Sequence, residues 1–169
     1  IPPATWIIMA KWPAYLLMKT LILGYGNTLR KDDGLGIYAA QTLDSLDLPG
    51  AVEICTYQQL SPELSSMLAK VDHAIFIDAA LVAGGQEPGT INTRVLHPRT
   101  SQPSSITHHF DPETLLAMAG ALYGHVPQAM LFSVTAASFD LGEDLSPEVT
   151  SALPLLVESI KEYLFALPA

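Results

Sequence analysis

Apolar residues along this chain fall into short runs separated by amphipathic segments, a pattern that predicts alternating strands and helices. Residues 21–24, 74–80 and 129–135 are almost continuously apolar, which is typical of strands buried on both faces of a sheet. Residues 52–57 and 90–96 alternate between apolar and polar positions, and the second of these segments is typical of an edge strand. The pattern therefore predicts an α/β fold with about five strands and with helices on both faces of the sheet.

Three tripeptides mark the expected beginnings of helices: Ser61-Pro62-Glu63, Asp111-Pro112-Glu113 and Ser146-Pro147-Glu148. In each, the first side chain can accept hydrogen bonds from free backbone amides, the proline suits the first helical position, and the acid complements the helix dipole. A further helix is predicted over residues 37–46, before a turn signal. Pro154 lies within the last predicted helix, which is therefore expected to kink there or to begin later.

The length of 169 residues corresponds to one domain, large enough to bury a core without disulfides or a structural metal. Residues 1–17 do not fit the pattern of the rest, because two tryptophans and three prolines crowd a short segment. We expect this segment to be an N-terminal extension, or an addition to the natural chain, before a natural start at Met18. Residues 18–169 are then a single α/β domain.

The amino-acid composition limits the kinds of molecule that the protein could bind. The net charge is −9 with only 8 lysines and arginines, which argues against nucleic acid and anionic membranes as partners, since both require a basic patch. No apolar run approaches the length of about 20 residues that spans a bilayer. The single cysteine, Cys55, cannot form an intrachain disulfide and is expected to be a small buried residue in a strand. We expect a soluble protein of the reducing cytoplasm.

Candidate chemistry begins where the first predicted strand ends. The strand runs into Gly24 and Gly26, and a polar loop then leads to the adjacent carboxylates of Asp32 and Asp33. A dinucleotide fingerprint would require a third glycine where the chain has Leu29, and the two aspartates would repel a pyrophosphate. The loop therefore indicates acid at the carboxyl edge of the sheet, where ligands of open α/β sheets bind.

Two further segments could add to this acid. Asp78 ends another buried strand and so lies at the same edge as Asp33, although an aspartate there often only forms a turn. His108 and His109 precede a predicted helix, and with the two carboxylates one imidazole would suit a borderline metal such as zinc or nickel. Sequence spacing cannot show that these residues converge. The other histidines are expected to be structural or to lie in a turn: His73, His97 and His125.

These segments together resemble the hydrogenase maturation endopeptidases. The resemblance extends from Met18 to about Leu164 and rests on residues 24–29 with 32–36, on residues 77–79 and on residues 107–109. It implies a three-layer α/β/α fold around a twisted, mostly parallel five-stranded sheet. It also implies an aspartic-type, nickel-dependent endopeptidase, which removes the C-terminal extension from the large-subunit precursor of [NiFe] hydrogenase once nickel is in place.

By motif, the resemblance places the metal-contacting and catalytic roles on Asp33, Asp78 and His108, with His109 as the less favoured histidine. The nickel would be carried by the precursor, and other divalent metals could substitute for it. Many relatives have Glu where this chain has Asp33. Where the family often has Asp-Gly-Gly-Thr, residues 57–60 read Tyr-Gln-Gln-Leu, which looks like the subgroup that serves bidirectional, NAD(P)-linked hydrogenases.

Two other functions remain open from the sequence. A chaperone could check the metal of the same precursor without cutting it, and a small-molecule α/β hydrolase could use the same crevice. For the endopeptidase, the sequence leaves open whether a metal activates water or polarises the scissile carbonyl, or whether a carboxylate such as Asp33 acts as general base.

Overall fold

The computed structural model describes residues 18–82, 84–99 and 110–167. Its centre is a five-stranded sheet of order β2-β1-β3-β5-β4, with strands β1 (Lys19–Tyr25), β2 (Ala51–Tyr57), β3 (His73–Ala80), β4 (Ile91–Leu96) and β5 (Gln128–Thr135). All neighbouring strands are parallel except β4, which runs antiparallel to β5 at the edge of the sheet. The predicted α/β fold with a mostly parallel five-stranded sheet is confirmed, and so is the edge position of residues 90–96.

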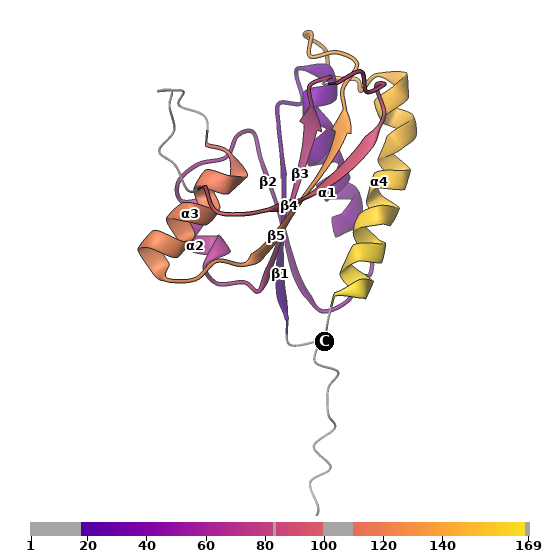
Figure 1. Cartoon of the computed structure of the whole chain (residues 1–169). Coiled ribbons are helices and arrows are strands. Elements are labelled where there is room, and N and C mark those ends of the chain that lie inside the picture. The colour runs from indigo at the N-terminus through magenta and orange to yellow at the C-terminus, as the bar shows by residue number, and fades with distance from the viewer. Residues whose placement is uncertain (1–17, 83, 100–109, 168–169) are drawn as a thin grey trace, which may run out of the picture.

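Helices cover both faces of the sheet and make three layers (Figure 1). On one face lie α1 (Leu35–Asp44) and α4 (Pro147–Ala166), and on the other lie α2 (Leu64–Leu68) and α3 (Pro112–Tyr123). A short 3₁₀ helix, η2 (Lys31–Gly34), precedes α1. Among the described residues, no helix is long and apolar enough to cross a membrane.

Alternate side chains of the central strands enter two separate cores, because successive residues of a strand point to opposite faces. On β1, Ile22 packs with α1 and α4, whereas Leu21 and Leu23 pack with α2 and α3. All three side chains are fully buried. At the other edge of the sheet, β2 has only one neighbouring strand, and Cys55 is therefore only partly buried rather than fully buried as expected.

Two of the three predicted helix caps are confirmed. Asp111 caps α3, and its side chain accepts a hydrogen bond from the Thr114 amide at 2.8 Å. Ser146 caps α4 in the same way, with its hydroxyl accepting from the Val149 amide at 3.4 Å. These caps satisfy amides that have no partner within the helix, so α3 and α4 begin where the sequence indicates.

The prediction at Ser61 is wrong, and so is the later start considered for the last helix. Residues 61–63 form a tight turn in which the Leu64 amide donates to the Ser61 carbonyl, and α2 begins only at Leu64 with no side-chain cap. The helix α4 begins at Pro147 and continues through Pro154. Residues 1–17 are outside the described residues, so a domain boundary after residue 17 stays a prediction.

Gly24 in β1 and Gly36 in α1 allow this helix to begin in direct contact with the sheet. A Cβ atom on Gly36 would lie 2.3 Å from the Ile77 carbonyl oxygen and 2.4 Å from that of Tyr25, and one on Gly24 would lie 2.1 Å from the Gly36 oxygen. Neighbouring backbone cannot accommodate such contacts without moving. These glycines are therefore required for close packing of helix on strand, which fixes the position of the intervening loop.

A buried carboxylate ties this loop to the other side of the fold. Asp32 is fully buried, and its carboxylate accepts hydrogen bonds from the Ala137 amide at 2.8 Å and the Ser138 amide at 3.0 Å. It also accepts from the amide of Ser146 at 2.6 Å and from its hydroxyl at 2.9 Å. Asp32 thereby joins η2 to the connection between β5 and α4.

Gly36→Ala is expected to lower the free energy of unfolding by about 3 kcal/mol, because the added methyl group would displace the backbone of β1 and β3. Gly120→Ala in α3 is the matched control. Its Cβ would meet only the Val126 side chain, at 2.8 Å. Both changes gain about 1 kcal/mol of helix propensity, and urea unfolding would separate them. Equal stability of the two variants would contradict the packing role of Gly36.

Asp32→Asn is expected to lower the free energy of unfolding by about 2–4 kcal/mol. The amide nitrogen would face backbone N–H donors in a site without water access, so at least one buried donor would lose its acceptor. Asp47→Asn, on an exposed side chain after α1, is the control and is expected to change stability by less than about 0.5 kcal/mol. Urea denaturation measures both, and a neutral effect of Asp32→Asn would show that these bonds do not stabilise the fold.

Candidate active site

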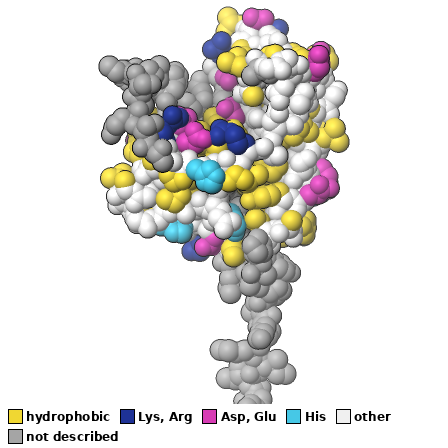
Figure 2. All heavy atoms as spheres, viewed as in Figure 1, with side chains coloured by type: hydrophobic (Ala, Val, Ile, Leu, Met, Phe, Trp, Pro, Cys, Tyr) yellow, Lys and Arg dark blue, Asp and Glu magenta, His cyan; other side chains and the backbone are white. Residues whose placement is uncertain are grey.

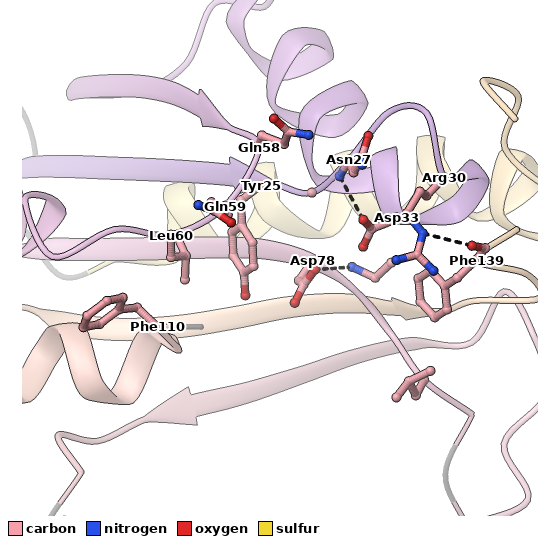
Figure 3. Close-up of a pocket in the computed structure, with 13 residues that line it drawn as sticks. Tyr25, Asn27, Arg30, Asp33, Gln58, Gln59, Leu60, Asp78, Phe110 and Phe139 are labelled. Carbon is pink, nitrogen blue, oxygen red and sulfur yellow. Dashed lines mark hydrogen bonds between the residues drawn. The ribbon is translucent and has the colours of Figure 1, made fainter. Parts of the chain in front are cut away.

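A pocket of about 710 Å³ opens at the carboxyl edge of the sheet, where β1, β2 and β3 end (Figure 3). The loop after β1 contributes Arg30 and Asp33, the loop after β2 contributes Gln58 and Gln59, and β3 contributes Asp78. Ligands of open α/β sheets bind at this edge because the loops after parallel strands meet there. The pocket is thus the candidate active site.

The structure brings together two of the predicted site residues. Asp33 and Asp78 both line the pocket, although 45 positions separate them in the sequence. In the fold, Asp33 is held by η2, and its Oδ2 accepts a hydrogen bond from the Asn27 amide at 2.9 Å. Asp78 accepts one from the Ala79 amide at 2.8 Å through Oδ1. Both carboxylates are partly buried and point toward the same space (Figure 3).

Burial changes the acidity of this pair. The pKa of Asp78 is raised from 3.8 to about 6, chiefly by desolvation and to a smaller extent by the nearby Asp33 carboxylate, whereas hydrogen bonds from the Tyr25 hydroxyl and the Ala79 amide work in the opposite direction. Burial, with the charge of Asp78 beside it, raises the pKa of Tyr25 well above its usual range. Asp78 is thus a carboxylate that holds its proton more tightly than an ordinary aspartate.

The third predicted ligand, His108, lies outside the described residues, and so does the alternative, His109. Within residues 18–82, 84–99 and 110–167, no three His, Cys, Asp or Glu side chains form a cluster able to hold a metal ion. Asp33 and Asp78 supply oxygen donors of a kind that divalent metals accept. Two carboxylates fit part of a coordination sphere, and the remaining ligands would have to come from a histidine or from a bound partner.

The other three predicted histidines, His73, His97 and His125, do not line the pocket. His73 begins β3, at the opposite end of that strand from Asp78, where it is buried with Nε2 3.3 Å from the Met18 sulfur. Burial lowers the pKa of His73, which favours the neutral ring. His97 is exposed after β4, and Nε2 of His125 lies 2.9 Å from the Val71 carbonyl oxygen. The burial of His73 agrees with the structural role that the sequence indicates.

Sequence analysis missed Arg30, Tyr25 and Phe139, which also line the pocket. Arg30 and Tyr25 have a sequence signal, since both lie between Gly24 and Asp33, the segment in which the candidate chemistry begins. Phe139 has none, because it reaches the pocket from the connection between β5 and α4. Its place depends on the Asp32 hydrogen bonds to residues 137 and 138.

Asp78→Asn is expected to stabilise the metal-free protein above pH 6. The folded protein binds this proton more tightly than the unfolded chain does, so wild-type stability falls as the pH rises from 3.8 to about 6. The amide cannot ionise, yet it keeps an oxygen for the Ala79 amide. Urea unfolding in EDTA should show a gain of about 1–3 kcal/mol at pH 8 and little gain at pH 4. An equal gain at both values, or one also seen for Asp47→Asn, would rule out this origin.

Comparison with known proteins finds similarity to hydrogenase maturation proteases. The hydrogenase 2 maturation protease of Escherichia coli (strain K12) is 28% identical over 149 residues, which cover 85% of this chain and 88% of that protein. No protein-family model matches the chain.

Solved structures give the same result over most of the chain. The hydrogenase maturating endopeptidase HybD from Escherichia coli is 28% identical with a TM-score of 0.67, covering 88% of this chain and 93% of that one. The [NiFe] hydrogenase maturation protease HycI from Thermococcus kodakarensis is 25% identical with a TM-score of 0.68, over the same shares of the two chains. The expected resemblance is confirmed in both sequence and fold. Over most of its length this chain is therefore similar in sequence and fold to hydrogenase maturation endopeptidases.

Proposed function

We propose that this protein is an endopeptidase that removes the C-terminal extension of a [NiFe] hydrogenase large-subunit precursor after nickel has been inserted. One observation carries the proposal. In a chain similar to hydrogenase maturation endopeptidases, Asp33 follows β1, Asp78 lies in β3, and both line one pocket at the carboxyl edge of the sheet. Carboxylates in an accessible pocket can bind a metal or accept a proton, and either role can assist the hydrolysis of a peptide bond.

Recognition would depend on the nickel that the precursor carries. In the precursor, soft cysteine thiolates would hold the metal, and hard carboxylate oxygens with one imidazole would complete its coordination. In this protein Asp33, Asp78 and His108 would provide those groups. A nickel-free precursor would lack the ion that brings these residues together, so the extension would stay in place until metal insertion is complete.

Asp78 is also suited to proton transfer. A carboxylate with a pKa of about 6 is mostly ionised at neutral pH, and it accepts a proton more readily than an ordinary aspartate does. Asp78 or Asp33 could therefore take the proton of the attacking water, while the metal of the precursor would polarise the scissile carbonyl. The aspartic-type assignment stays a prediction, as does a cytoplasmic location.

The loop after β2 offers a place for choosing between precursors. Gln58 and Gln59 are exposed and line the pocket at the position where many family members carry Asp-Gly-Gly-Thr. Amide side chains can donate and accept hydrogen bonds but carry no charge. We propose that this loop contacts the precursor, and the assignment to the subgroup for bidirectional hydrogenases stays a prediction.

The test is to mix the protein with a cognate large-subunit precursor, with and without bound nickel, and to read the precursor by intact mass. Loss of one defined C-terminal peptide from the nickel-loaded sample alone is expected. Asp33→Ala, Asp78→Ala and His108→Ala should each lower the cleavage rate by about 100-fold or more, because each removes a group that acts on the metal or on a proton. Asp47→Ala and His109→Ala are the matched controls and should cleave at the wild-type rate.

The outcomes separate the alternatives. Complex formation that requires nickel but produces no mass change would favour a metal-checking chaperone. Wild-type activity of any one site variant would remove that residue from the site, and loss of activity in His109→Ala with an active His108→Ala would move the histidine role by one position. Turnover of a soluble metabolite without a precursor would favour the small-molecule hydrolase.

A further inference from the structure

Arg30 places a positive charge in the pocket that Asp33 and Asp78 line. Its backbone amide donates to the Asn27 carbonyl at 3.0 Å, and the residue forms a parallel bridge with Gly142. Its Nε donates to the Phe139 carbonyl oxygen at 3.2 Å. Both the backbone and the side chain are thus held, and Figure 3 shows the side chain extending from the loop toward Phe139 and the pocket.

The terminal nitrogens of Arg30 are available to a ligand. An arginine carries five N–H donors, and the bond to Phe139 uses the one on Nε. Within the part of the chain that the structure describes, no carboxylate oxygen lies within 4.0 Å of this guanidinium, although two carboxylates line the same pocket. The side chain is exposed, so a docked peptide could reach it.

The other arginines differ in this respect. Arg94 forms an ion pair with Glu113, and Arg99 forms one with Asp111. On the face that Figure 2 shows, Lys and Arg side chains lie next to acidic ones. Arg30 is thus the arginine whose guanidinium is held in place by a backbone carbonyl instead of being neutralised by a described carboxylate.

We propose that Arg30 binds the carbonyl oxygen of the scissile peptide bond and stabilises the negative charge that develops on it. The inference rests on the proposed endopeptidase function and adds a catalytic residue to it. The two carboxylates that line the pocket can serve the attacking water, and a guanidinium held in the same pocket can serve the oxygen that becomes charged. A guanidinium keeps its charge at any working pH and presents several donors in one plane.

The chemical step assigns each proton and electron pair. The oxygen of water forms a bond to the carbonyl carbon while its proton moves to a pocket carboxylate, and the electron pair of the C=O double bond moves onto the oxygen beside Arg30. When this oxyanion re-forms the double bond, the C–N bond breaks and the carboxylate returns the proton to the leaving amine nitrogen. Arg30 contacts the oxygen throughout and transfers no proton.

The role predicts a specific kinetic signature in single-turnover cleavage of nickel-loaded precursor, with the enzyme in excess and varied in concentration. Arg30→Gln is expected to lower the maximal rate by about 100-fold, with the half-saturating enzyme concentration within about 3-fold of wild type, because the interaction strengthens only as charge develops. Arg30→Lys should be intermediate. Lys31→Gln, in the same loop but outside the pocket lining, removes the same charge and should cleave at the wild-type rate.

Chemical rescue separates this role from a structural one. Millimolar guanidinium chloride should restore about 10-fold or more of the lost rate to Arg30→Ala without changing its melting temperature. If the cleavage rate recovers only together with the melting temperature, Arg30 acts by holding the loop of Phe139 in place, and the proposal is overturned. So would a raised half-saturating concentration at an unchanged maximal rate, or an Arg30→Gln variant as fast as wild type. An inactive wild-type protein would overturn the endopeptidase function, and the role of Arg30 with it.

Discussion

The candidate site depends on a carboxylate that takes no part in its chemistry. Asp32 is fully buried and accepts hydrogen bonds from residues 137, 138 and 146, which lie in the connection between β5 and α4. Residues of both joined segments line the pocket: Arg30 and Asp33 come from the loop that contains η2, and Phe139 comes from the connection between β5 and α4. Two loops more than 100 positions apart in the sequence therefore act as one unit. The hydrogen bonds to Asp32 stabilise this unit, because a buried donor that has no acceptor is strongly unfavourable.

Two adjacent aspartates thus have opposite environments. Asp32 points inward and accepts four hydrogen bonds, whereas Asp33 points to the pocket and accepts one, from the Asn27 amide. Asp78 adds a carboxylate whose ionisation is opposed by burial. Asp32 thus stabilises the loop, whereas Asp33 and Asp78 present their carboxylates to the pocket. Such a separation lets the pocket hold groups that are unfavourable for folding, because the loop that carries them is fixed by another residue.

The fold and part of the site followed from simple rules of sequence. The continuously apolar segments predicted the buried strands of the sheet. Because the carboxyl ends of parallel strands meet at one edge, the sequence also predicted that Asp33 and Asp78 lie at the same edge. What local sequence could not supply were contacts between distant segments. In the sequence Gly24 indicates only a turn, yet both Gly24 and Gly36 are required because the helix and strand backbones touch at these residues. The bond from Arg30 to Phe139 spans 109 positions, and the tripeptide at Ser61 has the same letters as a true cap but forms only a turn.

The charged residues that line the pocket determine which kinds of ligand group it can bind. Two carboxylates and one arginine line it, and the chain as a whole carries a net charge of −9. Such a surface disfavours an anionic ligand and favours a cation. Arg30 does not neutralise the carboxylates, since it is held by a backbone oxygen. The carboxylates therefore stay available to a cation, and the terminal nitrogens of the guanidinium stay available to an oxygen acceptor, so the pocket can serve two ligand groups of opposite charge at once.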